Sequence, residues 1–535
     1  MPRLLRFSLL LAAVGLVFAG PAAATHLQGG DLTYASLGNN RYRVTLHLYR
    51  DCSGIVPGTF TLEGRNGSCN SAPSVSAVLT LVGTPVAARQ YCATLSGACN
   101  SGLTNSEMYT YAADITLPPA ARWVLSTSQN ARPNTTNLAT SGDLYLEATL
   151  NNLVPAAGTT GQVLVNTSPV VSALPAFFVP VHQMTTLSNS GYDADGDSLS
   201  YSLETPLLAC NMPVSYTAYP QTNPTVITTN PLCVFQGPTY SAYSTALPII
   251  VDHDTLGACP ARTAGTPRFS FDTRTGALTM QPGRYLPTNT TLGDNKYAAA
   301  VKISEYRRLN GSYVLVGTMR RELYFMVYDC GTNLMPRFAP AATVEVGTRS
   351  TVQPTGQIIT TLPGEPVSVV VTATDANATQ VPIFTLDYSS GTATTLLNLG
   401  AGRARVTFTP SLTMPDGLYR VAVTAEDDAC PIKGLDSQVL TFRVRRTALA
   451  ARPSTALRVA AFPNPFTDHV RFQLAAAGVQ TLTICDYLGR TVATVRSQAD
   501  GSVRWLPAAG LPTGLYLARG AQGTQPVRLL RQAAR

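Results

Sequence analysis

The chain has 535 residues and a formal net charge of +8, and only 13% of its residues are charged. This length is too great for one hydrophobic core and predicts three to five domains, at about 100–200 residues per domain. The charge is concentrated at the two ends, because residues 1–24 carry two arginines and residues 457–535 carry a net +6, which leaves the body neutral. A neutral body has no basic stripe to neutralise phosphates, which argues against a nucleic-acid partner.

The first 24 residues have the pattern of a secretory signal peptide. Arg3 and Arg6 precede an apolar run from Phe7 to Phe18, and small residues end the segment at Ala24. This order of basic, apolar and small residues predicts cleavage and export. No other segment reaches the roughly 18 uninterrupted apolar residues of a membrane helix. We therefore expect no membrane-spanning segment in the mature chain.

Period-2 alternation dominates the next region, residues 25–172. In the run 42–49, Val44, Leu46 and Leu48 fall on one face of a predicted strand, and Arg43, Thr45 and His47 fall on the other. Further alternating runs at 76–82, 108–117 and 144–150 are separated by Gly, Asn and Pro. Short strands with turn signals between them predict an all-β fold and an N-terminal β-sandwich domain.

The remaining chain divides into three further β regions. Residues 173–335 contain two strand-like runs, 297–307 and 313–319, joined by Asn310-Gly311, a dipeptide typical of a type I′ hairpin turn. We predict a cadherin-like or PKD-like β domain there, and an Ig-like β-sandwich over 336–446. Residues 447–456, which are rich in Ala with Arg and Pro, are predicted to form a linker. Residues 457–535, a series of strand-like runs spaced by Gly and Pro, are predicted to form a small β-sandwich.

Ten cysteines and an export signal predict disulfides. Four cysteines lie in the first predicted domain and four lie between Cys210 and Cys330, and the sequence leaves the pairing within each set open. Cys430 and Cys485 have no evident partner within their own predicted domains.

Three carboxylates at Asp193, Asp195 and Asp197 form a candidate calcium site. Hard oxygen ligands at this spacing are suited to Ca²⁺. An EF-hand is excluded, because Ser198 stands where that loop requires glycine. The alternative is a solvated Asp/Gly turn that leads into a strand.

Known catalytic patterns are absent from the sequence. It contains no Gly-x-Ser-x-Gly elbow, Walker loop or dinucleotide-binding glycine motif in the required context, and none of its five histidines lies in a zinc pattern. We therefore expect a protein that is not an enzyme.

Three motifs in the last 75 residues occur in a fixed order: Pro-Asn-Pro-Phe, then Asp-Tyr-Leu-Gly-Arg, then Leu-Pro-x-Gly-Leu-Tyr. Together they resemble the type A C-terminal sorting domain of the type IX secretion system. The resemblance implies transport across the outer membrane by the type IX secretion machinery, followed by release or surface anchoring. The residues that carry it are Pro463, Asn464, Pro465, Phe466, Gly489, Arg490, Gly514 and Tyr516.

Two further stretches resemble surface proteins. Residues 25–34 with 48–52 are similar to the opening of gliding-motility-associated and PKD-like surface proteins of bacteria that use this system, and residues 193–201 are similar to motifs of cadherin-like and PKD-like adhesion modules. We expect an exported, non-enzymatic protein at the cell surface or outside the cell, with adhesion or surface and matrix interaction as its role. Surface polysaccharide or other surface proteins are the expected partners. The alternative is an exported hydrolase or glycan-binding protein whose site is built from loops.

Overall fold

The computed structural model describes most of the chain after the predicted signal peptide. The signal peptide and the predicted linker lie outside the described residues. The described residues form thirty-nine β-strands and no α-helix, which confirms the all-β fold class. Within them there is accordingly no helix long and apolar enough to cross a membrane. The described ranges are 27–51, 54, 56–87, 90–92, 106–130, 132–155, 161–171, 178–220, 226–227, 240–254, 266–287, 293–386, 393–446, 460–473, 479–519 and 527–533.

The chain folds as two compact units. The first comprises residues 1–446 and the second comprises residues 447–535. Their division falls at the start of the predicted linker.

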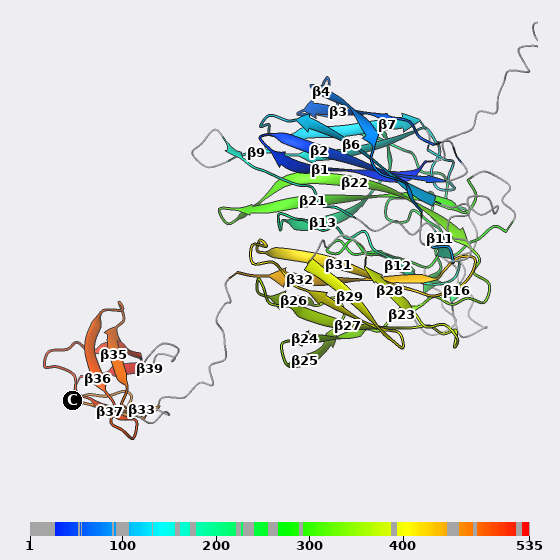
Figure 1. The fold of residues 1–535 in the computed structure, drawn as a ribbon. Coiled ribbons are helices and arrows are strands. Elements are labelled where there is room, and N and C mark those ends of the chain that lie inside the picture. The colour runs from blue at the N-terminus through cyan, green and yellow to red at the C-terminus, as the bar shows by residue number, and fades with distance from the viewer. Residues whose placement is uncertain are drawn as a thin grey trace, which may run out of the picture. The chain divides into compact units, whose positions relative to one another are not determined.

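A sheet of twelve strands organises the N-terminal part of the first unit (Figure 1). Eight of its strands pair in a closed circuit, because β1 pairs with β2 on one side and with β22 on the other. In circuit order they are β1 (Leu27–Gly38), β2 (Arg41–Asp51), β6 (Ser106–Thr116), β4 (Val75–Leu81), β3 (Phe60–Asn66), β7 (Trp123–Asn130), β8 (Asp143–Leu150) and β22 (Ser312–Tyr328). The other four are β21 (Lys296–Leu309), β13 (Ser198–Glu204), β11 (Phe178–Pro180) and β5 (Val86–Ala87).

The predicted strand faces are confirmed in β2. Val44, Leu46 and Leu48 are almost fully buried, as an inward-facing period-2 set should be. The predicted hairpin is also present, since β21 and β22 pair antiparallel around Asn310 and Gly311, and both residues have positive φ angles.

The predicted domain boundary near Ser172 does not separate two sheets. Strand β22, from the second predicted domain, pairs with β1 and β8 from the first, and the buried side chains of both regions form one core. Gly29 permits this closure, because a Cβ at that position would lie 2.1 Å from the carbonyl oxygen of Glu322. Local patterns predicted the strands correctly but do not record which distant strand completes a sheet.

Among its described residues, the N-terminal part of the same unit also contains ten short strands outside the twelve-stranded sheet. They form small sheets of two or three strands between the long strands of the chain. These are β9 (Leu153–Val154), β10 (Gln162–Val163), β12 (Thr185–Leu187), β14 (Leu207–Ala209), β15 (Met212–Pro213), β16 (Val226–Ile227), β17 (His253–Asp254), β18 (Thr266–Pro267), β19 (Phe269–Phe271) and β20 (Leu278–Met280).

An Ig-like sandwich completes the first unit. One sheet has the order β25-β24-β27-β30-β29, with β23 beside β27, and the other has the order β26-β32-β31-β28. Their inner faces enclose a separate core of Val, Ala and Phe side chains. The strands are β23 (Arg337–Phe338), β24 (Ala341–Val346), β25 (Arg349–Pro354), β26 (Ile358–Thr361), β27 (Val367–Thr374), β28 (Ile383–Leu386), β29 (Thr394–Gly400), β30 (Arg403–Phe408), β31 (Gly417–Glu426) and β32 (Leu435–Val444).

Two disulfides join regions that the sequence analysis assigned to different domains. Cys69 bonds to Cys210, and Cys92 bonds to Cys430, which lies 338 residues later in the Ig-like sandwich. The expectation of pairing within each set of four is therefore wrong for Cys69, Cys92 and Cys210. The cause is the shared sheet, which brings distant segments side by side.

The second unit is a small β-sandwich, as predicted. Its sheets have the orders β33-β34-β37 and β36-β35-β38-β39, and aromatic and aliphatic side chains fill the space between them. The strands are β33 (Ala460–Phe462), β34 (Val470–Gln473), β35 (Thr481–Asp486), β36 (Thr491–Arg496), β37 (Ser502–Trp505), β38 (Gly514–Arg519) and β39 (Val527–Arg531).

Candidate functional site

The acidic run lies in the connection between β12 and β13. Asp193 and Asp197 are 2% and 3% exposed, and the backbone N–H of Asp197 donates to Asp193 Oδ1 at 2.9 Å. Gly196 closes the turn with φ +78°. The segment is thus an Asp/Gly turn, but two of its three carboxylates are buried, unlike those of a solvated turn.

The turn packs against the Ig-like sandwich. A Cβ at Gly196 would lie 2.9 Å from Tyr419 Oη and 3.0 Å from Pro415 Cβ, so only glycine fits without displacing a neighbour. The ring of Tyr192 also lies 5.8 Å from the ring of Tyr419, between centroids. The acidic turn therefore sits where the large sheet meets the sandwich.

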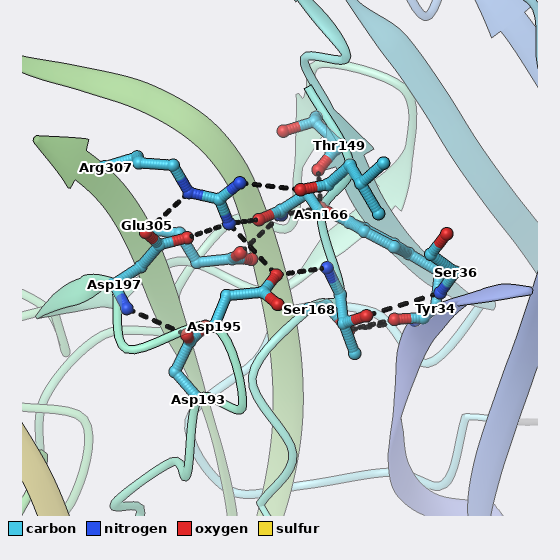
Figure 2. A network of polar contacts seen from close by, with 12 residues as sticks. Tyr34, Ser36, Thr149, Asn166, Ser168, Asp193, Asp195, Asp197, Glu305 and Arg307 are labelled. Atoms are coloured by element: carbon cyan, nitrogen blue, oxygen red, sulfur yellow. Dashed lines mark hydrogen bonds and ion pairs between the residues drawn. The ribbon is translucent and has the colours of Figure 1, made fainter. Parts of the chain in front are cut away.

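Arg307 on β21 holds two of the three aspartates (Figure 2). Its Nε donates to Asp197 Oδ1 at 2.9 Å and its Nη2 donates to Asp197 Oδ2 at 2.7 Å, a bidentate pair. The same Nη2 lies 3.0 Å from Asp195 Oδ2. Asp195 Oδ2 also accepts the backbone N–H of Thr167 at 2.8 Å.

Glu305 is the acidic residue that the sequence analysis missed. It lies two residues before Arg307 on β21, is fully buried, and accepts from Asn166 Nδ2 through Oε2 at 2.6 Å. Asp193, Asp197 and Glu305 each bring one carboxylate oxygen to within 4.8 Å of the others. The signal was present in the sequence, because Glu305 continues the inward-facing alternation of Val301 and Ile303 and is the one acid in it.

Burial makes ionisation of the innermost carboxyls unfavourable. Desolvation, with a smaller contribution from the neighbouring Asp197, raises the pKa of Asp193 to about 7. Desolvation and the charge of Asp193 raise the pKa of Glu305 well above its usual range. The two carboxyls without a guanidinium partner are therefore the two that resist ionisation.

The structure rearranges the predicted ligand set. It keeps Asp193 and Asp197 together and adds Glu305, whereas Asp195 is 30% exposed at its side chain and is engaged by Arg307 and Thr167. Among the described residues, the neighbouring Asp252 and His253 do not belong to any comparable group of possible metal ligands. Asp252 instead faces His182, with Oδ2 3.0 Å from Nδ1.

In the second unit, the Pro-Asn-Pro-Phe motif follows β33 and is hydrogen-bonded to the last strand, β39. Asn464 Nδ2 donates to the carbonyl of Arg528 at 2.7 Å, and Asn464 Oδ1 accepts from the N–H of Leu530 at 2.8 Å. Pro463 and Pro465 flank this asparagine. Phe466 is 1% exposed and packs against Trp505, with ring centroids 5.5 Å apart.

The other two motifs form a turn and a strand. Asp486 Oδ1 accepts the backbone N–H groups of Leu488 and Arg490, Oδ2 accepts from Arg490 Nε at 2.8 Å, and Gly489 has φ +82°. Gly514 begins β38, and Tyr516 on that strand donates from Oη to the carbonyl of Pro512 at 2.6 Å. Asn464, Phe466 and Asp486, together with Arg490 and Tyr516, thus make contacts that hold one small sandwich together.

Comparison with protein families matches residues 460–528 to the secretion system C-terminal sorting domain. The chain ends in a type IX secretion sorting domain. The match covers all three motifs; it begins with β33 and ends within β39. The type IX sorting domain implies interaction with the secretion machinery and export to the cell surface or the extracellular space. Disulfides in the first unit fit an oxidising, exported location.

No curated protein matches the chain. Among solved structures, domains A168-A170 from titin are 9% identical, with 68% of this chain and 99% of that chain covered and a TM-score of 0.15. Human CDH23 EC21-23 is 14% identical, with 50% and 81% covered and a TM-score of 0.17. The N-terminal four Ig domains of Dscam1 isoform 7.44 are 8% identical, with 95% and 100% covered and a TM-score of 0.20.

Proposed function

We propose that this exported β protein acts without catalysis, in adhesion or in interactions with the cell surface or matrix. The observation that supports the proposal is an open face of mixed polar and apolar side chains on the closed sheet. Strands β2, β4 and β6 turn a shallow groove of about 570 Å³ toward solvent. An extended polar polymer or another surface protein is the kind of partner that such an open face fits.

The groove offers hydroxyl groups and one ion pair. Thr45, Thr80 and Thr110 line it, together with Arg43 and Asp114, and three alanines and two valines form the other half of the lining. Arg43 Nε donates to Asp114 Oδ1 at 2.8 Å, and Nη2 donates to Oδ2 at 3.1 Å, so the charges are fixed in a bidentate pair. Hydroxyls and a paired charge provide both donors and acceptors, which is the chemistry that polysaccharide hydroxyls require.

The test is binding of the exported protein to surface polysaccharide and to whole cells of its own species. Thr80 is exposed in the groove, so Thr80→Arg should fill the groove and weaken binding at least about tenfold, which corresponds to about 1.4 kcal/mol. Thr351→Arg is the matched control, because Thr351 is exposed on β25 of the Ig-like sandwich. Equal binding by both variants would remove the groove from the proposal.

An exported hydrolase is the second candidate, and one pair of residues favours it. The side chain of His182 is 49% exposed while its Nδ1 faces the fully buried Asp252. A carboxylate that orients an accessible imidazole is a common arrangement for a general base. Incubation of the protein and of His182→Ala with glycan, ester and peptide substrates separates the candidates. Product that forms with the wild type and disappears with the variant would favour the hydrolase.

A further inference from the structure

We propose that Asp193, Asp197 and Glu305 bind one hard divalent cation, with Ca²⁺ as the best fit. The inference concerns the junction between the large sheet and the Ig-like sandwich and does not depend on the proposed adhesive role. Asp193 and Asp197 come from the acidic turn, and Glu305 comes from β21, more than 100 residues later. Their oxygens lie within 4.8 Å of one another, a spacing that one ion at the centre can span.

Unsatisfied oxygens point to a missing ligand. Asp193 Oδ2 and Glu305 Oε1 are buried and have no hydrogen-bond partner among the described residues. The two side chains are 2% and 0% exposed, so water does not hydrate these oxygens freely. A buried, unpaired carboxylate oxygen is costly, and a metal ion is one of the few groups that removes the cost.

Charge balance favours a divalent ion. Four carboxylates meet here, those of Asp193, Asp195, Asp197 and Glu305, against the single guanidinium of Arg307. Arg307 pairs with Asp195 and Asp197, which leaves Asp193 and Glu305 without a cationic partner of their own (Figure 2). Without a cation these two carboxyls resist ionisation, and a divalent cation that displaces their protons would be matched by their two negative charges.

The ligand atoms select among metals. The group contains carboxylates alone and neither His nor Cys, so it suits Ca²⁺ or Mg²⁺ better than Zn²⁺ or copper. Ca²⁺ takes six to eight oxygens in flexible geometry and accepts irregular sites, whereas Mg²⁺ demands a near-ideal octahedron. A site shared by a turn and a sheet strand is irregular, which favours Ca²⁺. Extracellular modules commonly bind it at about 10⁻⁴ to 10⁻³ M.

Occupancy would stiffen the junction. The backbone of the acidic turn touches the sandwich, since a Cβ at Gly417 would lie 2.5 Å from the carbonyl oxygen of Gly196. An ion that ties Asp193 and Asp197 to β21 fixes the turn on which the sandwich rests. We therefore expect cation binding to stabilise the whole first unit against unfolding.

The test uses the mature full-length protein, melted in 5 mM Ca²⁺ and, separately, in chelator. Because a ligand that binds only the folded state stabilises it, the wild type should melt about 1–3 °C higher with Ca²⁺. Glu305→Gln should lose this response. It should also melt at the same temperature as the wild type or higher in chelator, since it removes an uncompensated buried acid. Glu345→Gln is the control. Glu345 lies in β24 of the Ig-like sandwich, outside the proposed site, and is paired with Arg405.

Elemental analysis of the protein dialysed against 5 mM CaCl₂, with the dialysis buffer as the blank, and calorimetric titration with CaCl₂ supply the second readout. One bound Ca²⁺ per chain in the wild type and none in Asp193→Asn would support the site. Equal melting of the wild type in Ca²⁺ and in chelator, with no bound metal, would overturn it. An undiminished Ca²⁺ response in Glu305→Gln would overturn it as well.

Discussion

Asp31 Oδ1 lies 2.8 Å from His47 Nδ1 across the β1–β2 pairing, and the carboxylate is completely buried. Tyr49 donates from Oη to the other oxygen of Asp31 at 2.9 Å, and Arg321 Nε lies 3.7 Å from that oxygen. Arg321 comes from β22, so the group lies where the closed circuit of strands is completed. It links strands that the sequence analysis assigned to separate domains.

The Asp31–His47 pair predicts a defined pH window of stability. Burial disfavours the charged forms of both groups. The interactions of Asp31 with His47, Arg321 and Tyr49 are stronger than this effect and lower the pKa of Asp31. The interaction of His47 with Asp31 is likewise stronger than burial and raises the pKa of His47. A lowered carboxyl pKa gives stability that is present above the unfolded value, about 3.8, and is lost as pH falls through the folded value. A raised imidazole pKa gives stability that is present below about 6.5 and is lost as pH rises through the folded value.

We therefore expect the pair to stabilise the first unit most between about pH 4 and 6.5. Asp31→Asn should cost about 3 kcal/mol there, and the cost should shrink at pH 9. Trp123 is buried in β7, so its fluorescence in a Trp505→Phe background reports denaturant unfolding of this unit alone. A penalty for Asp31→Asn that stays constant from pH 5 to pH 9 would contradict the ion-pair explanation.

The Cys92–Cys430 disulfide should hold the Ig-like sandwich to the sheet. It closes a loop of 338 residues, and the neighbouring Tyr91 forms a β-bridge with Ile432. Replacing both cysteines by serine should cost about 2–5 kcal/mol, because the unfolded chain gains conformational freedom. Limited proteolysis and denaturant unfolding measure the effect. Cys330→Ser is the control, since Cys330 is a free thiol and should change stability by less than the double variant.

Local features were predictable from the sequence, and long-range ones were not. The faces of β2 and the Asn310-Gly311 turn follow from residue periodicity and turn chemistry within a few residues. The closure by β22 depends on pairing with β1 and β8, about 290 and 170 residues away, which no local pattern records. The sorting domain was recognisable because its motifs lie on neighbouring elements of one small fold.

The candidate site was also predictable from the sequence only in part. Asp193 and Asp197 were visible as a run of acids, but their neighbour Glu305 comes from another strand. An acid at an inward-facing position of an apolar strand was a usable signal, and it would have placed Glu305 in the core. The proximity of Glu305 to Asp193 and Asp197 could not be predicted, because only the folded sheet brings β21 next to the acidic turn.

The folded sorting domain should be required for export. Phe466 fills the centre of the small sandwich, so Phe466→Ala should cost about 3–5 kcal/mol and unfold this unit first. We expect the variant chain to remain in the periplasm, as should a chain that lacks residues 457–535. Fractionation into periplasm, outer membrane and medium measures the outcome. Val479→Ala is the stability control, because Val479 is 67% exposed and lies outside the three sorting motifs. Normal export of a destabilised Phe466→Ala variant would show that the machinery does not require the folded sandwich.

Gly196 should be the most sensitive position of the acidic turn. Its φ of +78° disfavours any other residue, and an added Cβ would meet Tyr419 and Pro415 at about 3 Å. Gly311 has φ +88° but an added Cβ would meet nothing within 4 Å, so Gly311→Ala carries the cost of the backbone conformation alone. We expect Gly311→Ala to lower the free energy of unfolding by about 1 kcal/mol. Gly196→Ala should lower it by at least about 2 kcal/mol, because the added methyl group also displaces the sandwich. Denaturant unfolding followed by Trp123 fluorescence compares the two variants directly. Equal losses would mean that the turn and the sandwich are not held in contact, and the cation at Asp193 and Glu305 would then stabilise the turn without stiffening the junction.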